Sequence, residues 1–177
     1  RIGVSPMCMY SAEDGMANTP GLTLNYASLS SAFGTALIDS VDADDGAIDG
    51  NGNGGEAFWG AGSIEATFDA QVLGSLPTHA GFVWTDGVDD IVFEAFDQNG
   101  QSLGVLVGRH ADGDFVGGTA EDRFYGVVHM GGISRMIISD PSGIEVDHIQ
   151  YGAVPEPASV AALGLGLLAA RRRRPTT

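Results

Sequence analysis

Short segments in which apolar and polar residues alternate predict a chain built mainly of β-strands. In residues 63–68 the apolar side chains Ile64, Ala66 and Phe68 fall on one face, as in a half-buried strand. Seven further strand segments are bounded by glycine or aspartate clusters: 22–29, 81–85, 91–96, 103–107, 123–129, 133–139 and 144–151. No stretch shows a helical periodicity of useful length. The pattern therefore predicts an all-β fold.

Two dipeptides predict bends between these strands. Asn99-Gly100 lies between two of the segments, and both residues tolerate the positive φ that tight hairpins require. Asp86-Gly87 predicts a similar bend after residues 81–85. About eight short strands joined by turns fit an antiparallel β-sandwich or jelly roll.

Composition supports one such domain. The chain has 177 residues and a hydrophobic fraction of 44%, which is typical of a globular protein, and its 27 glycines suit many turns. Cys8 is the only cysteine, which excludes an intramolecular disulfide and a zinc site built from several thiolates. We expect an N-terminal segment at 1–20, incomplete or processed because it begins with Arg1, a sandwich at 21–153 and a separate tail at 154–177.

The charge is strongly negative and unevenly placed. The formal net charge is −15, and four of the eight basic residues form one block, Arg171, Arg172, Arg173 and Arg174. The acidic remainder repels phosphate backbones and shows no basic stripe with interleaved aromatic residues, so we expect no nucleic-acid partner. Divalent cations are the more plausible partners of such a surface.

The tail has three parts in a fixed order. Pro155-Glu156-Pro157 precedes an apolar run, Val160 to Ala170, and the arginine block follows it. As a helix the apolar part spans roughly 20 Å, shorter than a bilayer core of about 30 Å, so it predicts a short transmembrane helix accommodated by membrane thinning and snorkelling. The arginines would remain cytoplasmic by the positive-inside rule, which places the acidic domain outside.

This tail closely resembles the PEP-CTERM sorting signal, with Pro155, Glu156 and Pro157 as the motif and Arg171 to Arg174 as the membrane stop. The resemblance implies Sec export, transient anchoring in the inner membrane of a Gram-negative-type bacterium and processing by an exosortase. It implies a final location that is extracellular or at the cell surface. It assigns no residue to catalysis.

The domain before the tail carries a looser resemblance. The stretch from Phe68-Asp69 through Gly81–Asp86, Phe96–Gly100 and Phe124–Val127 to Asp147–Gly152 looks like the β-sandwich commonly carried by PEP-CTERM proteins. Its similarity to carbohydrate-binding jelly rolls implies an extracellular polysaccharide as partner, without a defined set of ligand residues.

A glycine-rich acidic loop is a candidate calcium site. Hard oxygen ligands suitable for Ca²⁺ gather at Asp42, Asp44, Asp49, Asn51 and Asn53. Asp49 onward matches half of an EF-hand loop, but the twelfth position is Gly60 instead of a bidentate glutamate, which excludes an EF-hand. The alternative is a solvated acidic loop without a metal.

Asp147 is a further candidate metal ligand. Strand alternation puts it on the same face as Ile149 and Tyr151, where a carboxylate requires a partner. Because few arginines are available, Ca²⁺ or backbone donors near a strand end are realistic alternatives to a salt bridge. The alternative is exposure at a sheet edge.

Aromatic residues offer the remaining candidate contacts. Trp59, beside the acidic loop, is the candidate for an exposed glycan contact, whereas Trp84, Tyr125 and Tyr151 are expected to pack in the core. A sandwich this small usually encloses most of its large aromatic side chains.

Catalytic signals are weak. Four separated histidines, a strand serine at Ser134 without a nucleophile elbow, and the acid pairs Asp89-Asp90 and Glu121-Asp122 do not rise above the acidic background. The sequence therefore predicts a non-catalytic glycan- or matrix-binding protein. A structural surface protein without a small ligand, or a glycoside hydrolase, remains the alternative.

Overall fold

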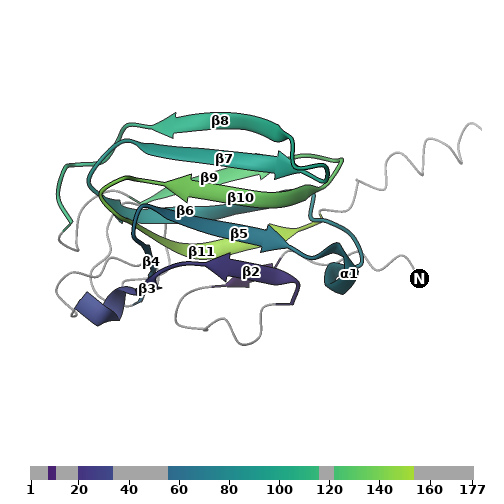
Figure 1. The fold of residues 1–177 in the computed structure, drawn as a ribbon, viewed down its shortest axis with the longest axis horizontal. Helices are drawn as coiled ribbons and strands as arrows, with labels where there is room; N and C mark the ends of the chain where they lie inside the picture. The colour runs from purple at the N-terminus through teal and green to yellow at the C-terminus, as the bar shows by residue number, and fades with distance from the viewer. Residues whose placement is uncertain (1–7, 11–19, 34–55, 116–121, 154–177) are drawn as a thin grey trace, which may run out of the picture.

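The computed structural model describes residues 8–10, 20–33, 56–115 and 122–153, and they form two packed antiparallel β-sheets (Figure 1). The six-stranded sheet contains β1 (Cys8–Tyr10), β3 (Ser28–Leu29), β4 (Phe58–Gly60), β6 (His79–Gly87), β9 (Arg123–Val128) and β11 (Ile144–Gly152). The five-stranded sheet contains β2 (Leu22–Asn25), β5 (Ser63–Phe68), β7 (Ile91–Asp97), β8 (Ser102–Gly108) and β10 (Ile133–Ser139). A 3-10 helix, η2 (Ser30–Phe33), and a short α1 (Ala70–Leu73) complete the described elements.

The strands from β4 onward pair in a nested order. β4 pairs with β11, β5 with β10, β6 with β9 and β7 with β8, all antiparallel. Nested pairing of eight strands across two sheets is the arrangement of a jelly roll. Figure 1 shows the resulting layers, with β8, β7, β10, β5 and β2 in front of β9, β6 and β11. The prediction of an all-β sandwich is confirmed.

Two strand predictions were incomplete. The segment 22–29 is divided between the sheets, because β2 pairs with β5 whereas β3 pairs with β4. Strands β1 and β4 were not predicted, since three residues each are too few to show alternation. β1 lies in the expected N-terminal segment 1–20 and nevertheless pairs with β11. The predicted transmembrane helix lies in residues 154–177, outside the described residues. Within the described ranges, no helix is long and apolar enough to cross a membrane.

The core lies between the sheets and is built from both. Trp84 is fully buried, as predicted, and Tyr125 and Tyr151 also belong to the core cluster. Phe82 of β6 meets Phe93 of β7 edge to face, with ring centroids 5.8 Å apart, so the pair joins the two layers. The Tyr151 hydroxyl donates to the Pro20 carbonyl at 2.7 Å, which satisfies its polar end inside an apolar setting.

The predicted turns had different outcomes. Asn99-Gly100 connects β7 and β8 as expected: Gly100 has φ 74°, and the Asp97 carboxylate accepts from the backbone N–H of Asn99 and Gln101. The bend predicted at Asp86-Gly87 is wrong, because both residues belong to β6. Gly87 allows the Trp84 ring to pack closely against the backbone there, since a Cβ would lie 2.9 Å from that ring.

Candidate functional site

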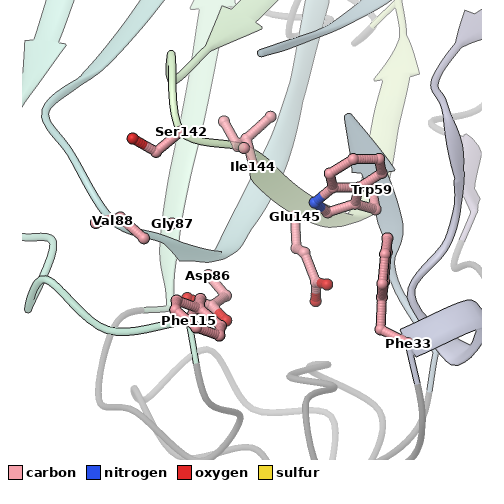
Figure 2. Close-up of a pocket in the computed structure, with 10 residues that line it drawn as sticks. Phe33, Trp59, Asp86, Gly87, Val88, Phe115, Ser142, Ile144 and Glu145 are labelled. Carbon is pink, nitrogen blue, oxygen red and sulfur yellow. The ribbon is translucent and has the colours of Figure 1, made fainter. Parts of the chain in front are cut away.

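A cavity of about 240 Å³ lies at one end of the six-stranded sheet (Figure 2). Strands β4, β6 and β11 supply its floor, η2 and the segment after β8 supply side walls, and the β10–β11 turn closes another side. The lining residues are Phe33, Trp59, Asp86, Gly87, Val88, Phe115, Ser142, Gly143, Ile144 and Glu145. Segments far apart in sequence therefore meet at one site.

Three lining side chains form a row across neighbouring strands. Trp59 of β4 is opposite Glu145 of β11, and Glu145 is opposite Asp86 of β6. Directly opposite residues in antiparallel strands place their side chains on the same face of the sheet. That face points away from the sandwich core, because the chain neighbours Phe58 and Val146 belong to the core cluster.

A β-bulge directs Asp86 to this row. Val146 opposes Trp84 while Glu145 opposes Asp86, so Thr85 is an extra residue on β6. Strict alternation from Trp84 would have turned Asp86 into the core. The extra residue moves the carboxyl group to the outer face, where the cavity lies.

Aromatic rings form opposite walls of the cavity. Phe33 packs edge to face on Trp59, with ring centroids 4.9 Å apart, and is 48% exposed. Phe115 is 64% exposed. Figure 2 shows the Glu145 side chain between the Trp59–Phe33 pair and the side chains of Asp86 and Phe115. Exposed aromatic rings beside buried acids are a chemical combination suited to binding.

Glycine at position 143 leaves room for the Trp59 indole. Gly143 has φ 120°, a conformation that side chains rarely adopt, and a Cβ there would lie 3.2 Å from the indole nitrogen. The turn that carries Gly143 therefore closes against the aromatic wall without displacing it.

Asp140 fixes the loops around the cavity. Its carboxylate is fully buried and accepts from the backbone N–H of Asp89 at 3.0 Å and of Ser142 at 2.8 Å. The Ser142 hydroxyl donates to the Asp89 carboxylate. These contacts hold the β6–β7 loop against the β10–β11 turn, so Val88, Ser142 and Gly143 keep their places in the lining.

The electrostatics of the site centre on Asp86. The pKa of this carboxyl group is raised from 3.8 to about 7. Burial is the largest cause, the charges of Asp112, Asp114 and Asp140 add to it, and the N–H of Gly87 opposes it by stabilising the ionised form. Asp86 is 3% exposed, and its Oδ1 has no hydrogen-bond partner among the described residues. The group is therefore partly protonated at neutral pH and has a polar atom available to a ligand.

Asp147 occupies a different place from the one predicted. It is opposite Val83, whose neighbours Phe82 and Trp84 face the core, so Asp147 lies on the outer face of the sheet. The prediction that it shares a face with Ile149 and Tyr151 is wrong, because a register shift follows Asp147 at His148, where φ is 44°.

Asp147 is also fully buried in a strand paired on both sides, so the alternative of edge exposure is wrong. Its Oδ2 lies 3.8 Å from Nε2 of His148. A role as metal ligand stays a prediction.

Of the remaining predicted binding residues, Trp59 lies within the described part of the chain and the others lie outside it. Trp59 lies in the cavity, and its contact with glycan stays a prediction. The predicted calcium ligands Asp42, Asp44, Asp49, Asn51 and Asn53, and the sorting residues of the tail, lie outside the described residues. In the part of the chain that the structure describes, no group of three or more His, Cys, Asp or Glu residues is arranged to hold a metal ion.

Sequence reasoning missed four of the five aromatic and acidic residues that line the cavity. Asp86 was assigned to a bend, while Phe33, Phe115 and Glu145 were not singled out. One signal was available: Glu145 lies between two apolar residues, Ile144 and Val146, near the start of a predicted strand. A charged residue in such a position requires a specific surrounding.

Comparisons with known proteins concern the sandwich and the tail separately. No curated protein matches the chain. A solved structure titled "Structure of TmCBM61 in complex with beta-1,4-galactotriose" is 13% identical, with 84% of each chain covered and a TM-score of 0.29. The sandwich thus distantly resembles a carbohydrate-binding module, and at this score and identity the resemblance carries no information about a ligand.

A family model described as the PEP-CTERM protein-sorting motif matches residues 153–174. The chain therefore has a PEP-CTERM sorting motif at its C-terminal end, which implies an exported, cell-surface protein processed by an exosortase.

Proposed function

We propose that the sandwich is a non-catalytic glycan-binding domain of this exosortase-sorted surface protein. The observation that carries the proposal is the cavity, in which Phe33, Trp59 and Phe115 form walls around the carboxyl groups of Asp86 and Glu145. Sugar rings offer apolar faces to aromatic side chains and hydroxyl groups to carboxyl groups. One small pocket supplies both kinds of contact.

The size of the cavity supports a single sugar unit as occupant. Its volume of about 240 Å³ is below the roughly 300–1,000 Å³ of pockets that enclose drug-sized ligands. The exposed Phe33 and Phe115 rings at its rim would contact adjoining units of a longer chain. A polysaccharide bound through one enclosed unit and two rim contacts fits this shape.

The positions of the two acids favour binding over hydrolysis. Glycoside hydrolysis requires two carboxyl groups that flank the scissile bond, one of them with a raised pKa. Asp86 meets the second requirement, which favours a glycoside hydrolase as a second candidate. Asp86 and Glu145, however, rise from directly opposite positions in one row of the sheet. Both groups therefore contact the same side of a bound sugar.

A binding titration tests the proposal. The full chain is titrated with a panel of polysaccharides in calcium and again in excess chelator, alongside Trp59→Ala and the matched variant Phe124→Ala, which removes an exposed ring on β9. We expect saturable, selective binding that Trp59→Ala weakens roughly tenfold and Phe124→Ala leaves unchanged. Loss of binding in chelator would place Ca²⁺ at the site. Release of shorter sugars from the polysaccharide would favour a glycoside hydrolase.

Absence of binding in both buffers would contradict the proposal and favour a structural surface protein. One observation supports that alternative: β8 is paired on one side only among the described strands and exposes Val105, Leu106 and Val107. An apolar edge strand of this kind can pair with a second copy of the chain. Sedimentation of the full chain with Leu106→Lys would then show less self-association than the unchanged chain.

A further inference from the structure

Two buried acids share one wall of the cavity. Asp86 is 3% exposed and Glu145 is 6% exposed, and the two lie directly opposite on β6 and β11. Cβ atoms at such positions are about 4.5–5.5 Å apart, so both carboxyl groups border the same small space. The charges of Asp112, Asp114 and Asp140 contribute to the raised pKa of Asp86, and a positive charge beside Asp86 would offset their repulsion.

Asp86 retains a polar atom for a ligand. Its carboxyl group accepts the N–H of Gly87, while Oδ1 has no hydrogen-bond partner among the described residues. The acids that face it from other elements are Glu145 on β11, Asp112 and Asp114 after β8, and Asp140 after β10. The described residues that line the cavity include two acids and no cationic side chain, so their charge favours a cation over an anion as ligand.

The aromatic walls select the kind of cation. Trp59, Phe33 and Phe115 line the same space, and aromatic faces attract cations within about 6 Å of the ring centre, with tryptophan the most effective. A metal ion is held by several oxygen ligands, whereas three aromatic rings line this space. An organic ammonium group attached to an apolar body matches aromatic walls and two carboxyl groups.

We propose that the cavity binds the protonated amino group of an amino sugar within a glycan. This inference rests on the proposed glycan-binding function and names the class of sugar. The ammonium group lies between Asp86 and Glu145 and donates to Oδ1 of Asp86, while the sugar ring contacts Trp59. The net charge of −15 attracts such a polycationic glycan to the domain and repels glycans built from uronic acids.

The test compares three oligosaccharides of equal length. The full chain is titrated calorimetrically at pH 6.0 with β-1,4-linked tetramers of glucosamine, of N-acetylglucosamine and of glucose. We expect the glucosamine tetramer to bind about tenfold more tightly than the other two. Binding should release protons, measured in buffers of different ionisation enthalpy, because the ammonium group favours the ionised carboxyl group of Asp86.

Two variants distinguish the cavity from general charge attraction. Asp86→Asn should remove the tenfold preference for the glucosamine tetramer and the proton release. Glu94→Gln removes one negative charge from β7 in the other sheet and should alter neither. If Asp86→Asn and Glu94→Gln weakened binding of the glucosamine tetramer equally, the inference would be overturned, because that result would indicate attraction by the overall charge of the protein.

The outcomes separate this inference from the proposed function. Equal binding of all three tetramers, weakened by Trp59→Ala, would overturn the amino-sugar inference and leave glycan binding intact. Absence of binding by any tetramer and by the wider polysaccharide panel would overturn both. A preference for the glucosamine tetramer that persists in Asp86→Asn would overturn the assignment to this cavity.

Discussion

Replacing Asp86 with asparagine should change the stability of the protein in a pH-dependent way. The substitution keeps the shape of the side chain and removes its ionisation. Asp86 is almost fully buried, and burial together with the charges of Asp112, Asp114 and Asp140 raises its pKa from 3.8 to about 7. The unfolded chain has no such surroundings, so its carboxyl group ionises near 3.8.

The magnitude follows from proton linkage. Between pH 3.8 and pH 7 the folded chain holds a proton on Asp86 that the unfolded chain has released. The free energy of unfolding therefore falls by about 1.4 kcal/mol per pH unit in this window and levels off above pH 7. The full window corresponds to roughly 4 kcal/mol, an upper value because water and relaxation reduce the cost of a buried charge. The Asp86→Asn variant has no proton to release at this position and avoids the loss.

Urea unfolding of the full chain, followed by tryptophan fluorescence at pH 4.5, 6, 7 and 8, measures the effect. We expect Asp86→Asn to match the unchanged chain at pH 4.5 within about 1 kcal/mol and to exceed it by about 2–4 kcal/mol at pH 8. Glu94→Gln serves as the control acid. A difference between variant and unchanged chain that is the same at every pH would refute the reasoning.

Three other predictions concern the frame of the site and the tail. Asp140→Ala should lower the free energy of unfolding by about 2–4 kcal/mol in urea, because two backbone N–H donors lose their acceptor; a loss under about 0.5 kcal/mol would contradict this. Gly143→Ala should weaken glycan binding in titration by displacing the Trp59 indole, and unchanged affinity would show that the turn adjusts freely. Alanines at Pro155, Glu156 and Pro157 should cause retention or misprocessing in an exosortase-competent host, seen by fractionation; unchanged release would contradict the sorting assignment.

The sequence predicted the layers of this fold better than its local irregularities. The sequence pattern identified β5 and β10 with the bounds that the structure has, because each strand buries one face and leaves the other at least partly accessible to solvent. It failed at β4, which is too short, and at 22–29, which crosses between sheets. Alternation measures which residues share a face, and it cannot show where a strand changes its pairing partner.

The candidate site depends on the features that alternation misses. Asp86 faces the cavity because of the extra residue Thr85, and Asp147 faces outward because the register shifts at His148. A bulge moves a side chain to the opposite face without leaving a composition signal. Trp59 was identified because a tryptophan beside an acidic loop is chemically distinctive. Phe33 and Phe115 became meaningful only when folding brought them to the same cavity.

The two sheets differ in a way that locates function on one of them. In the five-stranded sheet the outer face is solvated, as the alternating burial of β5 and the partly exposed Arg135–Glu65 ion pair show. In the six-stranded sheet β6 and β11 are buried on both faces, and the outer face includes three acids, Asp86, Glu145 and Asp147. Burying an acidic side chain costs desolvation free energy, and an apolar residue in the same position would not have this cost. Two of these acids line the cavity, where a bound ligand can offset the free-energy cost of burying them. An ammonium group on the proposed ligand would do so through its positive charge.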